Sequence, residues 1–147
     1  MTLTTEEIKW IDEYARLEQL DLGNHWQTYS FQRLQFRSEI HVRNYSGVRT
    51  TASCNVACSF VDRNEVKLYY GTVEKLLMIK GNDFTLRLAI VTTYKSPGTS
   101  KAGIPFIDLK SPYKTGKVIE VTSIDHKVIF TKDAKPFVLR VANKLGR

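Results

Sequence analysis

After Gly23, the apolar residues of this chain follow a period of two, and no other feature of the sequence constrains the fold as strongly. Successive residues of a β-strand point to opposite faces, so this alternation predicts strands with one buried face. We expect strands within residues 29–36, 40–42, 54–60, 66–79, 84–90, 118–121, 127–131 and 137–141. Several short strands, without a strand–helix–strand rhythm, predict a mainly β small barrel or sandwich.

Three stretches of the expected β region are irregular. The alternation slips by one residue within residues 29–36, which predicts a β-bulge there. Gly71 interrupts residues 66–79, which predicts one long strand with a bend at the glycine. Residues 95–117 contain three of the four prolines and three of the eight glycines. This composition predicts a long loop, with at most a short strand at residues 106–109.

Residues 5–21 have the pattern of one amphipathic helix. Thr4 and Glu7 have the spacing of a capping box, in which the hydroxyl and the carboxylate each accept a backbone N–H of the first turn. Gly23 is expected to end the helix. The apolar positions, spaced by about 3.6 residues, are Ile8, Ile11, Ala15 and Leu20. We therefore divide the chain into a helical appendage, residues 1–23, and a β domain, residues 24–147.

The charge is distributed unevenly between these two parts. Residues 1–23 contain two basic and six acidic residues, a net charge of −4, whereas residues 24–147 carry a net charge of +11. From residue 93 to the end, 11 basic residues outnumber four acidic ones. A positive field of this kind favours a polyanion or an acidic protein surface as partner, although a lysine-rich surface also serves solubility.

Residue types that carry catalysis or bind metals do not form a recognisable motif. Residues four apart on a strand are separated by about 13 Å, so Cys54 and Cys58 cannot share one metal ion, and we expect both to pack in the core. His126 is expected in a surface turn. Phosphate-binding, nucleophile and dinucleotide motifs are absent from the sequence. We expect no catalytic residue, metal or cofactor; a hydrolase or nuclease would need a carboxylate–histidine cluster assembled by the fold.

The chain also lacks sequence features of membrane insertion and secretion. No stretch approaches the roughly 18 consecutive apolar residues of a membrane-spanning helix. The first residues contain neither the basic nor the apolar region of a secretory signal. Two cysteines fit a reducing compartment better than a disulfide framework. We therefore expect an intracellular protein without a membrane partner.

Two basic segments are the candidate nucleic-acid contacts. One is the expected loop, in which lysines alternate with aromatic residues, so that lysines can follow phosphates and a tyrosine can stack on a base or sugar. The other is the arginine pair at residues 43–49, whose guanidinium groups suit phosphates and carboxylates alike. The candidate residues are Arg43, Arg49, Lys95, Lys101, Lys110, Lys114 and Lys117.

Three segments resemble bromo-adjacent homology (BAH) domains, and more closely the BAH-like module at the C-terminal end of CACTA (En/Spm)-type transposon proteins. They are residues 69–76 (Tyr-Tyr-Gly-Thr-Val-Glu-Lys-Leu), 84–91 (Phe-Thr-Leu-Arg-Leu-Ala-Ile-Val) and 119–130 (Ile-Glu-Val-Thr-Ser-Ile-Asp-His-Lys-Val-Ile-Phe). Residues 43–49, followed by residues 53–60, also resemble the arginine-rich segment that leads into a strand of that module, and residues 136–143 resemble its terminal strand. The resemblance covers roughly residues 28–145.

This resemblance implies an SH3-like, bent-strand β-barrel with an interaction role in the nucleus, on DNA or chromatin, in a transposon-derived protein. BAH domains that read methylated histone tails hold the ammonium group in a cage of aromatic rings. The corresponding segment here, residues 90–97, contains one aromatic residue, Tyr94, and so departs from that pattern.

A peptide-binding adaptor is the alternative function. A groove of the barrel or a free strand edge would then bind a histone tail or another transposon protein, such as a transposase. The acidic helix offers a further surface for a basic partner. The aromatic residues that could form a peptide pocket are Trp26, Tyr69, Tyr94 and Tyr113.

Overall fold

The protein is mainly β with one α-helix, as the sequence predicts. The computed structural model describes residues 3–23, 25–36, 38–45, 54–62 and 64–140, and the elements below refer to these residues. In chain order they are α1 (Thr5–Leu17), β1 (Gln27–Phe31), β2 (Arg33–Phe36), β3 (Ser38–His41), β4 (Asn55–Asp62), β5 (Glu65–Lys80), β6 (Thr85–Lys95), β7 (Asp108–Glu120), the 3-10 turn η1 (Val121–Ser123), β8 (Ile124–Phe130) and β9 (Val138–Arg140).

The strands form one large antiparallel sheet in the order β7-β6-β5-β4-β8-β9. The long strand β5 pairs with β4 along its first half and with β1 along its second half, so β1 and β4 occupy the same edge of β5 in succession. Strands β2 and β3 form a separate two-stranded sheet. The pairing of the described strands does not return from β9 to β7, so the sheet is open.

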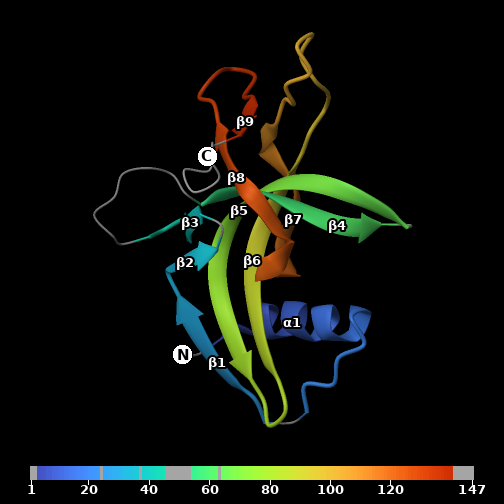
Figure 1. Ribbon diagram of the computed structural model, residues 1–147, viewed down its shortest axis with the longest axis vertical. Coiled ribbons are helices and arrows are strands. Elements are labelled where there is room, and N and C mark those ends of the chain that lie inside the picture. The colour runs from blue at the N-terminus through green and yellow to red at the C-terminus, as the bar shows by residue number, and fades with distance from the viewer. Residues whose placement is uncertain (1–2, 24, 37, 46–53, 63, 141–147) are drawn as a thin grey trace.

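Both faces of the sheet are buried where the second half of β5, the middle of β6 and the end of β7 lie side by side. Alternate residues of a strand point to opposite faces, and here each set enters a different apolar cluster. On one face, Leu77, Leu88 and Val118 pack with Ile11 of the helix. On the other face, Leu76, Ala89 and Ile119 join residues of β3, β4 and β8 in a second cluster. Figure 1 shows α1 lying across the sheet, on the face that the first cluster fills.

The beginning of α1 agrees with the sequence, and its end does not. The capping box is confirmed, since the Glu7 amide donates to the Thr4 hydroxyl over 3.1 Å and the Thr4 amide donates to the Glu7 carboxylate over 2.9 Å. The helix ends at Leu17 instead of residue 21. Gln19 adopts a left-handed conformation, φ 56°, and the Leu20 amide donates to the Ala15 carbonyl over 2.8 Å. This Schellman geometry ends the helix before Gly23 is reached.

The prediction that residues 29–36 form a single strand is wrong. They form two strands, β1 and β2, which lie in different sheets. Gln32, between them, accepts a hydrogen bond from the Val42 amide over 2.9 Å. A slip in the alternation therefore marks a change of partner strand rather than a bulge.

The predicted long loop at residues 95–117 is also wrong, because β7 occupies residues 108–120 and only residues 96–107 connect it to β6. Strand β7 is an edge strand, and its pairing with β6 shifts register three times between Val91 and Lys95. An edge strand with such irregularities tolerates Pro112 and Gly116, which a central strand would exclude. The prediction of one long strand through Gly71 is confirmed by β5.

Two glycines allow backbones and rings to approach closely. A Cβ atom at Gly71 would lie 2.7 Å from the Thr92 carbonyl oxygen of the neighbouring strand β6. Gly116 on β7 has a positive φ of 71°, and a Cβ atom there would occupy the position of the Trp10 indole. Gly116 therefore lets the helix rest directly on the edge strand.

At the end of the sheet away from β1, two connections pack against each other. Residues 96–107 link β6 to β7, and residues 131–137 link β8 to β9. The Ile107 amide donates to the Pro136 carbonyl, and the Val138 amide donates to the Pro105 carbonyl, each over 2.9 Å. The rings of Phe106 and Phe137 stack with their centroids 4.8 Å apart. We call residues 95–110 and 131–138 the hairpin end; Figure 1 shows both connections projecting from the same end of the molecule.

Candidate nucleic-acid interface and adjoining pockets

The hairpin end carries five lysines and two aspartates, a net charge of +3. Among the residues that the structure describes, none of these lysines forms an ion pair. Asp108 instead accepts a hydrogen bond from the Lys110 amide, over 3.1 Å. Unpaired ammonium groups on two adjoining connections and on the ends of β6 and β7 make this end a positive surface. The lysines are Lys95, Lys101, Lys110, Lys132 and Lys135.

The structure brings Lys95, Lys101 and Lys110 together here, and it places the other described candidates, Arg43, Lys114 and Lys117, on other elements or in other contacts. Arg43 is held by Glu74, Nε to Oε1 2.6 Å, and by the Tyr94 hydroxyl at 3.0 Å. Burial lowers the pKa of Arg43, but its hydrogen bonds to Tyr94 and Glu74 outweigh that effect and raise it. Lys114 lies 3.8 Å from Glu13 of the helix. Arg49 lies outside the described residues.

Sequence reasoning missed Lys132 and Lys135. Lys132 precedes the turn at residues 133–136 and Lys135 lies within it. The sequence does indicate this turn, but its packing against residues 96–107 is a long-range contact. Lys135 Nζ lies 5.2 Å above the Phe106 ring, which connects the two turns through a cation–π contact. The sequence of a segment can show that it forms a charged turn, but it does not show which other turn packs against it.

Three aromatic rings form a row that begins at the hairpin end. Tyr113 of β7 and Tyr69 of β5 are stacked with centroids 6.2 Å apart, and Tyr69 meets Phe60 of β4 edge-on at 4.9 Å. A lysine lies at each end of this row: Lys95 Nζ is 5.8 Å from the Tyr113 ring and Lys117 Nζ is 4.4 Å from the Phe60 ring. We call Phe60, Tyr69 and Tyr113 the aromatic row.

A pocket of about 450 Å³ opens beside the exposed end of the row. Three of the four aromatic residues predicted for peptide binding line it, and they differ in exposure: Tyr113 is 56% exposed, whereas Tyr94 is 7% exposed. Tyr70, which sequence reasoning missed, is the cross-strand partner of Tyr94, and burial raises its pKa. The full lining is Leu68, Tyr69, Tyr70, Tyr94, Lys95, Ser96, Pro97, Asp108 and Tyr113.

The fourth of these aromatic residues, Trp26, lies elsewhere. It packs on the cluster beneath α1 and lines a separate pocket with Gln27 and Lys80. That pocket is next to the turn between β5 and β6, which lies at the far end of both strands from Tyr94 and Tyr113. Trp26 therefore cannot join the other three in one peptide site.

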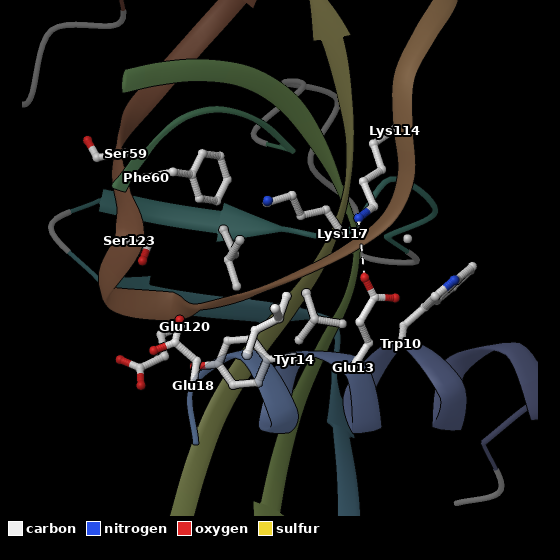
Figure 2. A pocket seen from close by; sticks show the side chains of 14 residues that line it. Trp10, Glu13, Tyr14, Glu18, Ser59, Phe60, Lys114, Lys117, Glu120 and Ser123 are labelled. Carbon is white, nitrogen blue, oxygen red and sulfur yellow. Dashed lines mark ion pairs between the residues drawn. The ribbon is translucent and has the colours of Figure 1, made fainter. Parts of the chain in front are cut away.

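A larger pocket, of about 600 Å³, lies between α1 and the edge strand β7, and we call it the helix groove. Figure 2 shows its two halves: Phe60, Lys114 and Lys117 lie on one side, and Tyr14, Glu18 and Glu120 lie on the other. The dashed line joins Glu13 to Lys114 across the rim. Phe60 belongs to both the groove and the aromatic row, so the row leads from the hairpin end into the groove.

In the acidic half of the groove, two carboxylates lie close to the Tyr14 phenol. Burial raises the pKa of the Tyr14 phenol, and the negative charge and hydrogen bond of Glu120 raise it further, together with the charge of Glu18. Glu120 also accepts a hydrogen bond from the Thr122 hydroxyl over 3.2 Å. Two carboxylates beside one phenol favour the approach of a cation.

The cysteines pack in the core, as predicted. Both are buried and free, and burial raises the pKa of Cys58 to about 12, helped by the charge of Asp125. Burial likewise raises the pKa of Cys54. A thiol with a raised pKa is a weak nucleophile at neutral pH. Within the described ranges, no three His, Cys, Asp or Glu side chains lie close enough together to hold a metal ion.

The expected position of His126 is wrong. It lies on strand β8 instead of in a turn, half-buried, with Nδ1 2.8 Å from the Asp125 carboxylate. The sequence places Asp125 and His126 at the start of an apolar alternation that a turn would not continue, and that pattern could have located the strand.

In the part of the chain that the structure describes, the helix is too short and too charged to cross a membrane.

Comparison of the chain with protein-family models gave no match, and neither the curated proteins nor the solved structures gave a significant one.

Proposed function

We propose that this protein is a non-catalytic interaction module that binds the phosphate backbone of DNA, with little sequence preference, through its hairpin end. The observation that carries the proposal is the set of five lysines on two adjoining connections and the strand ends beside them, without an ion pair among the described residues. A lysine that has no carboxylate partner can neutralise a phosphate, and the release of counterions then drives binding.

The geometry also supports weak sequence discrimination. Base edges are read by an element that enters a groove of the duplex. The described helix is packed on the sheet through Ile11 and begins with two acidic residues, Glu6 and Glu7, so its charge opposes entry into DNA. Lysines on turns contact phosphates as point charges without a fixed register.

The finer identity follows the resemblance of the sequence. We propose a BAH-like module in which the bent sheet corresponds to an SH3-like barrel, carried by a transposon-derived nuclear protein that associates with chromatin. The long bent β5, the antiparallel order and the interaction surfaces at the ends of strands support this assignment. The high pKa of Cys58 and the core position of both cysteines support a binding role over thiol catalysis.

The proposal is tested by neutralising Lys101, Lys110 and Lys132 together with glutamine. We expect the affinity for two duplexes of unrelated sequence to fall about equally, since phosphate contacts carry no sequence information. The slope of log affinity against log salt concentration should become shallower by about 0.9 for each phosphate that the variant no longer neutralises. Fluorescence anisotropy with labelled duplexes across a salt series measures both quantities.

A matched control changes the charge of the whole protein by the same amount at a distant surface. Lys9, Lys80 and Arg87 are exposed residues of α1, β5 and β6, and their replacement by glutamine also removes three positive charges. If the two triple variants bind equally well, the hairpin end has no special role and the proposal is wrong.

The helix groove supports a second candidate function, a peptide-binding adaptor. The specific observation is the pair of carboxylates, Glu18 and Glu120, beside the Tyr14 ring in an aromatic-lined groove. This arrangement suits an arginine or lysine side chain of a protein partner, such as a histone tail or another transposon protein. Replacing both carboxylates by glutamine should weaken saturable binding of a basic peptide and leave duplex binding unchanged or slightly stronger.

A further inference from the structure

Deepening the proposed DNA-binding function, and resting on it, we infer that the aromatic row makes this protein prefer single-stranded polynucleotides. Unpaired bases would stack on Tyr113 and Tyr69, while the adjoining phosphates contact the lysines of the hairpin end. The ligand class is therefore a single-stranded nucleic acid with accessible base faces, and not the duplex as such.

The spacing of the two tyrosine rings is the first support. Their planes are 15° from parallel and their centroids are 6.2 Å apart. A planar base held between two rings needs about 7 Å, since stacked atoms approach to about 3.5 Å on each side. The ring centroids are closer than this, so a base can enter between the rings only when one of them moves outward.

Tyr113 is the ring that can make this movement. It is 56% exposed and lies on β7, the edge strand whose register with β6 is irregular on both sides of Thr93. Tyr69, by contrast, is half-buried and is supported from behind by Phe60. Of the two rings that would hold a base between them, Tyr69 is thus fixed and Tyr113 can move. The 450 Å³ pocket beside them gives room for a base.

One cation lies beside the two tyrosine rings, and two others come from the neighbouring connection and strand. Lys95 is adjacent to the Tyr113 ring, and Lys110 is three residues before Tyr113 on the same strand. Lys101 extends the positive surface along the connection between β6 and β7. Aromatic platforms with flanking cations are the usual means of binding single strands without sequence preference.

A duplex cannot use the same arrangement. Its base faces are covered by neighbouring base pairs, and exposing one requires unstacking. The lysines remain able to contact its phosphates, so a duplex should bind through charge alone. The single-strand preference is then the contribution of the rings, and it can be measured separately from the contribution of the lysines.

The experiment compares four labelled probes of equal length, about 12 nucleotides or base pairs, which is within the site size of small single-strand-binding domains. They are a dT strand, the matching rU strand, an abasic strand and a duplex. We expect the wild-type protein to bind dT roughly tenfold more tightly than the abasic strand, which has the phosphates but no bases. The dT and rU arms distinguish a DNA from an RNA preference. Anisotropy titrations at one fixed salt concentration give all four affinities.

Variants of Tyr113 assign the effect to the ring. Tyr113→Ala should bind dT about tenfold more weakly and the abasic strand with unchanged affinity, whereas Tyr113→Phe should keep the wild-type values. Tyr29→Ala is the matched control, because Tyr29 is also an exposed strand tyrosine, 43% exposed, but lies on β1. Equal thermal unfolding of the three tyrosine variants excludes a folding defect.

Equal binding of the dT and abasic strands, or equal effects of Tyr113→Ala and Tyr29→Ala, overturns the single-strand inference and leaves the phosphate-binding proposal intact. Failure of all four probes to bind at low salt overturns both. Salt-insensitive, saturable binding of a peptide that Tyr113→Ala weakens, with no preference for dT, would instead identify the tyrosine pocket as a protein site, and would also overturn the inference.

Discussion

The helix-covered half of the molecule and the hairpin end differ in how their charged side chains are partnered. Two ion pairs join α1 to the sheet: Glu7 lies 2.6 Å from Lys75, and Glu13 lies 3.8 Å from Lys114. At the hairpin end, five lysines have no such partner among the described residues. The first region contains a large apolar cluster that includes Ile11, and the second a small one that includes Ile107.

This contrast indicates that the helix region stabilises the fold and that the hairpin end binds a ligand, a difference that we call the division of labour between the two regions. Paired charges and a large buried cluster stabilise the fold at the helix. Unpaired lysines on turns repel one another and add little to stability, so their clustering is better explained by a ligand. Changes near the helix should therefore alter stability without altering nucleic-acid affinity, and changes at the hairpin end should do the reverse.

The largest effect is expected for Ile11→Ala. Ile11 is fully buried between the helix and the sheet, and its truncation should lower the free energy of unfolding by about 3 kcal/mol, because apolar burial decreases and a cavity remains. Ile8→Ala, on the same helix but at a position that is 41% exposed, is the control and should cost less than about 1 kcal/mol. Urea denaturation measures both, and a weaker affinity of folded Ile11→Ala for DNA would contradict the division of labour.

Gly116→Ala should have the next largest effect, about 2 kcal/mol. The new Cβ would enter the space of the Trp10 indole, and alanine is also strained at φ 71°. Gly103→Ala separates these causes, since Gly103 has φ 81° with open space around it. It should be destabilised by about 1 kcal/mol from strain alone. Equal destabilisation of the two variants would mean that the helix does not rest on Gly116, a contact that Trp fluorescence would report independently.

The ion pair between Glu7 and Lys75 predicts a pH dependence. Burial raises the pKa of Glu7, but hydrogen bonds from Lys75 and Thr4 outweigh it and lower the pKa below its usual value. A carboxylate with a lowered pKa stabilises the folded state above its unfolded pKa of about 4.3, and this contribution is lost as the pH falls through the lower folded pKa.

Glu7→Gln should therefore be about 1.5 kcal/mol less stable than the wild type at neutral pH and closer to it in acid, below the folded pKa of the carboxylate. Thermal unfolding at both pH values provides the measurement. Glu6→Gln, at the exposed neighbouring position, should leave the pH dependence almost unchanged. A Glu7→Gln variant that follows the wild-type pH profile would show that this ion pair does not hold the helix to β5.

Local sequence patterns predicted much of this fold. The capping box of Thr4 and Glu7 and the continuous strand through Gly71 depend on neighbours within a few residues, and both are present. The strand β7 was missed because Pro112 and Gly116 indicate a loop locally, whereas an edge position in the sheet tolerates them. Which strand lies at an edge is a property of the whole sheet, and one sequence does not reveal it.

The same limit applied to the candidate site. Lys95, Lys101 and Lys110 were recognised because they lie in one charged segment. Lys135 and Phe60 come from other segments, and only the fold brings Lys135 to Phe106 and Phe60 to Tyr69. Arg43 was assigned to the same surface from its residue type, but the partner that neutralises it, Glu74, is 31 residues away.

The smallest effect is expected at the end of α1, where a local prediction failed. Gln19 occupies the left-handed position of a Schellman motif, φ 56°, at which glycine is the preferred residue. Gln19→Gly should therefore stabilise the protein by about 0.5–1 kcal/mol by removing the conformational strain. Glu18→Gly, at φ −89° in the preceding position, should destabilise it by a similar amount because glycine loses more backbone entropy there. If glycine at position 19 gives no gain, the helix end is fixed by the burial of Leu22 beneath it, and tertiary packing rather than the backbone motif determines where α1 stops.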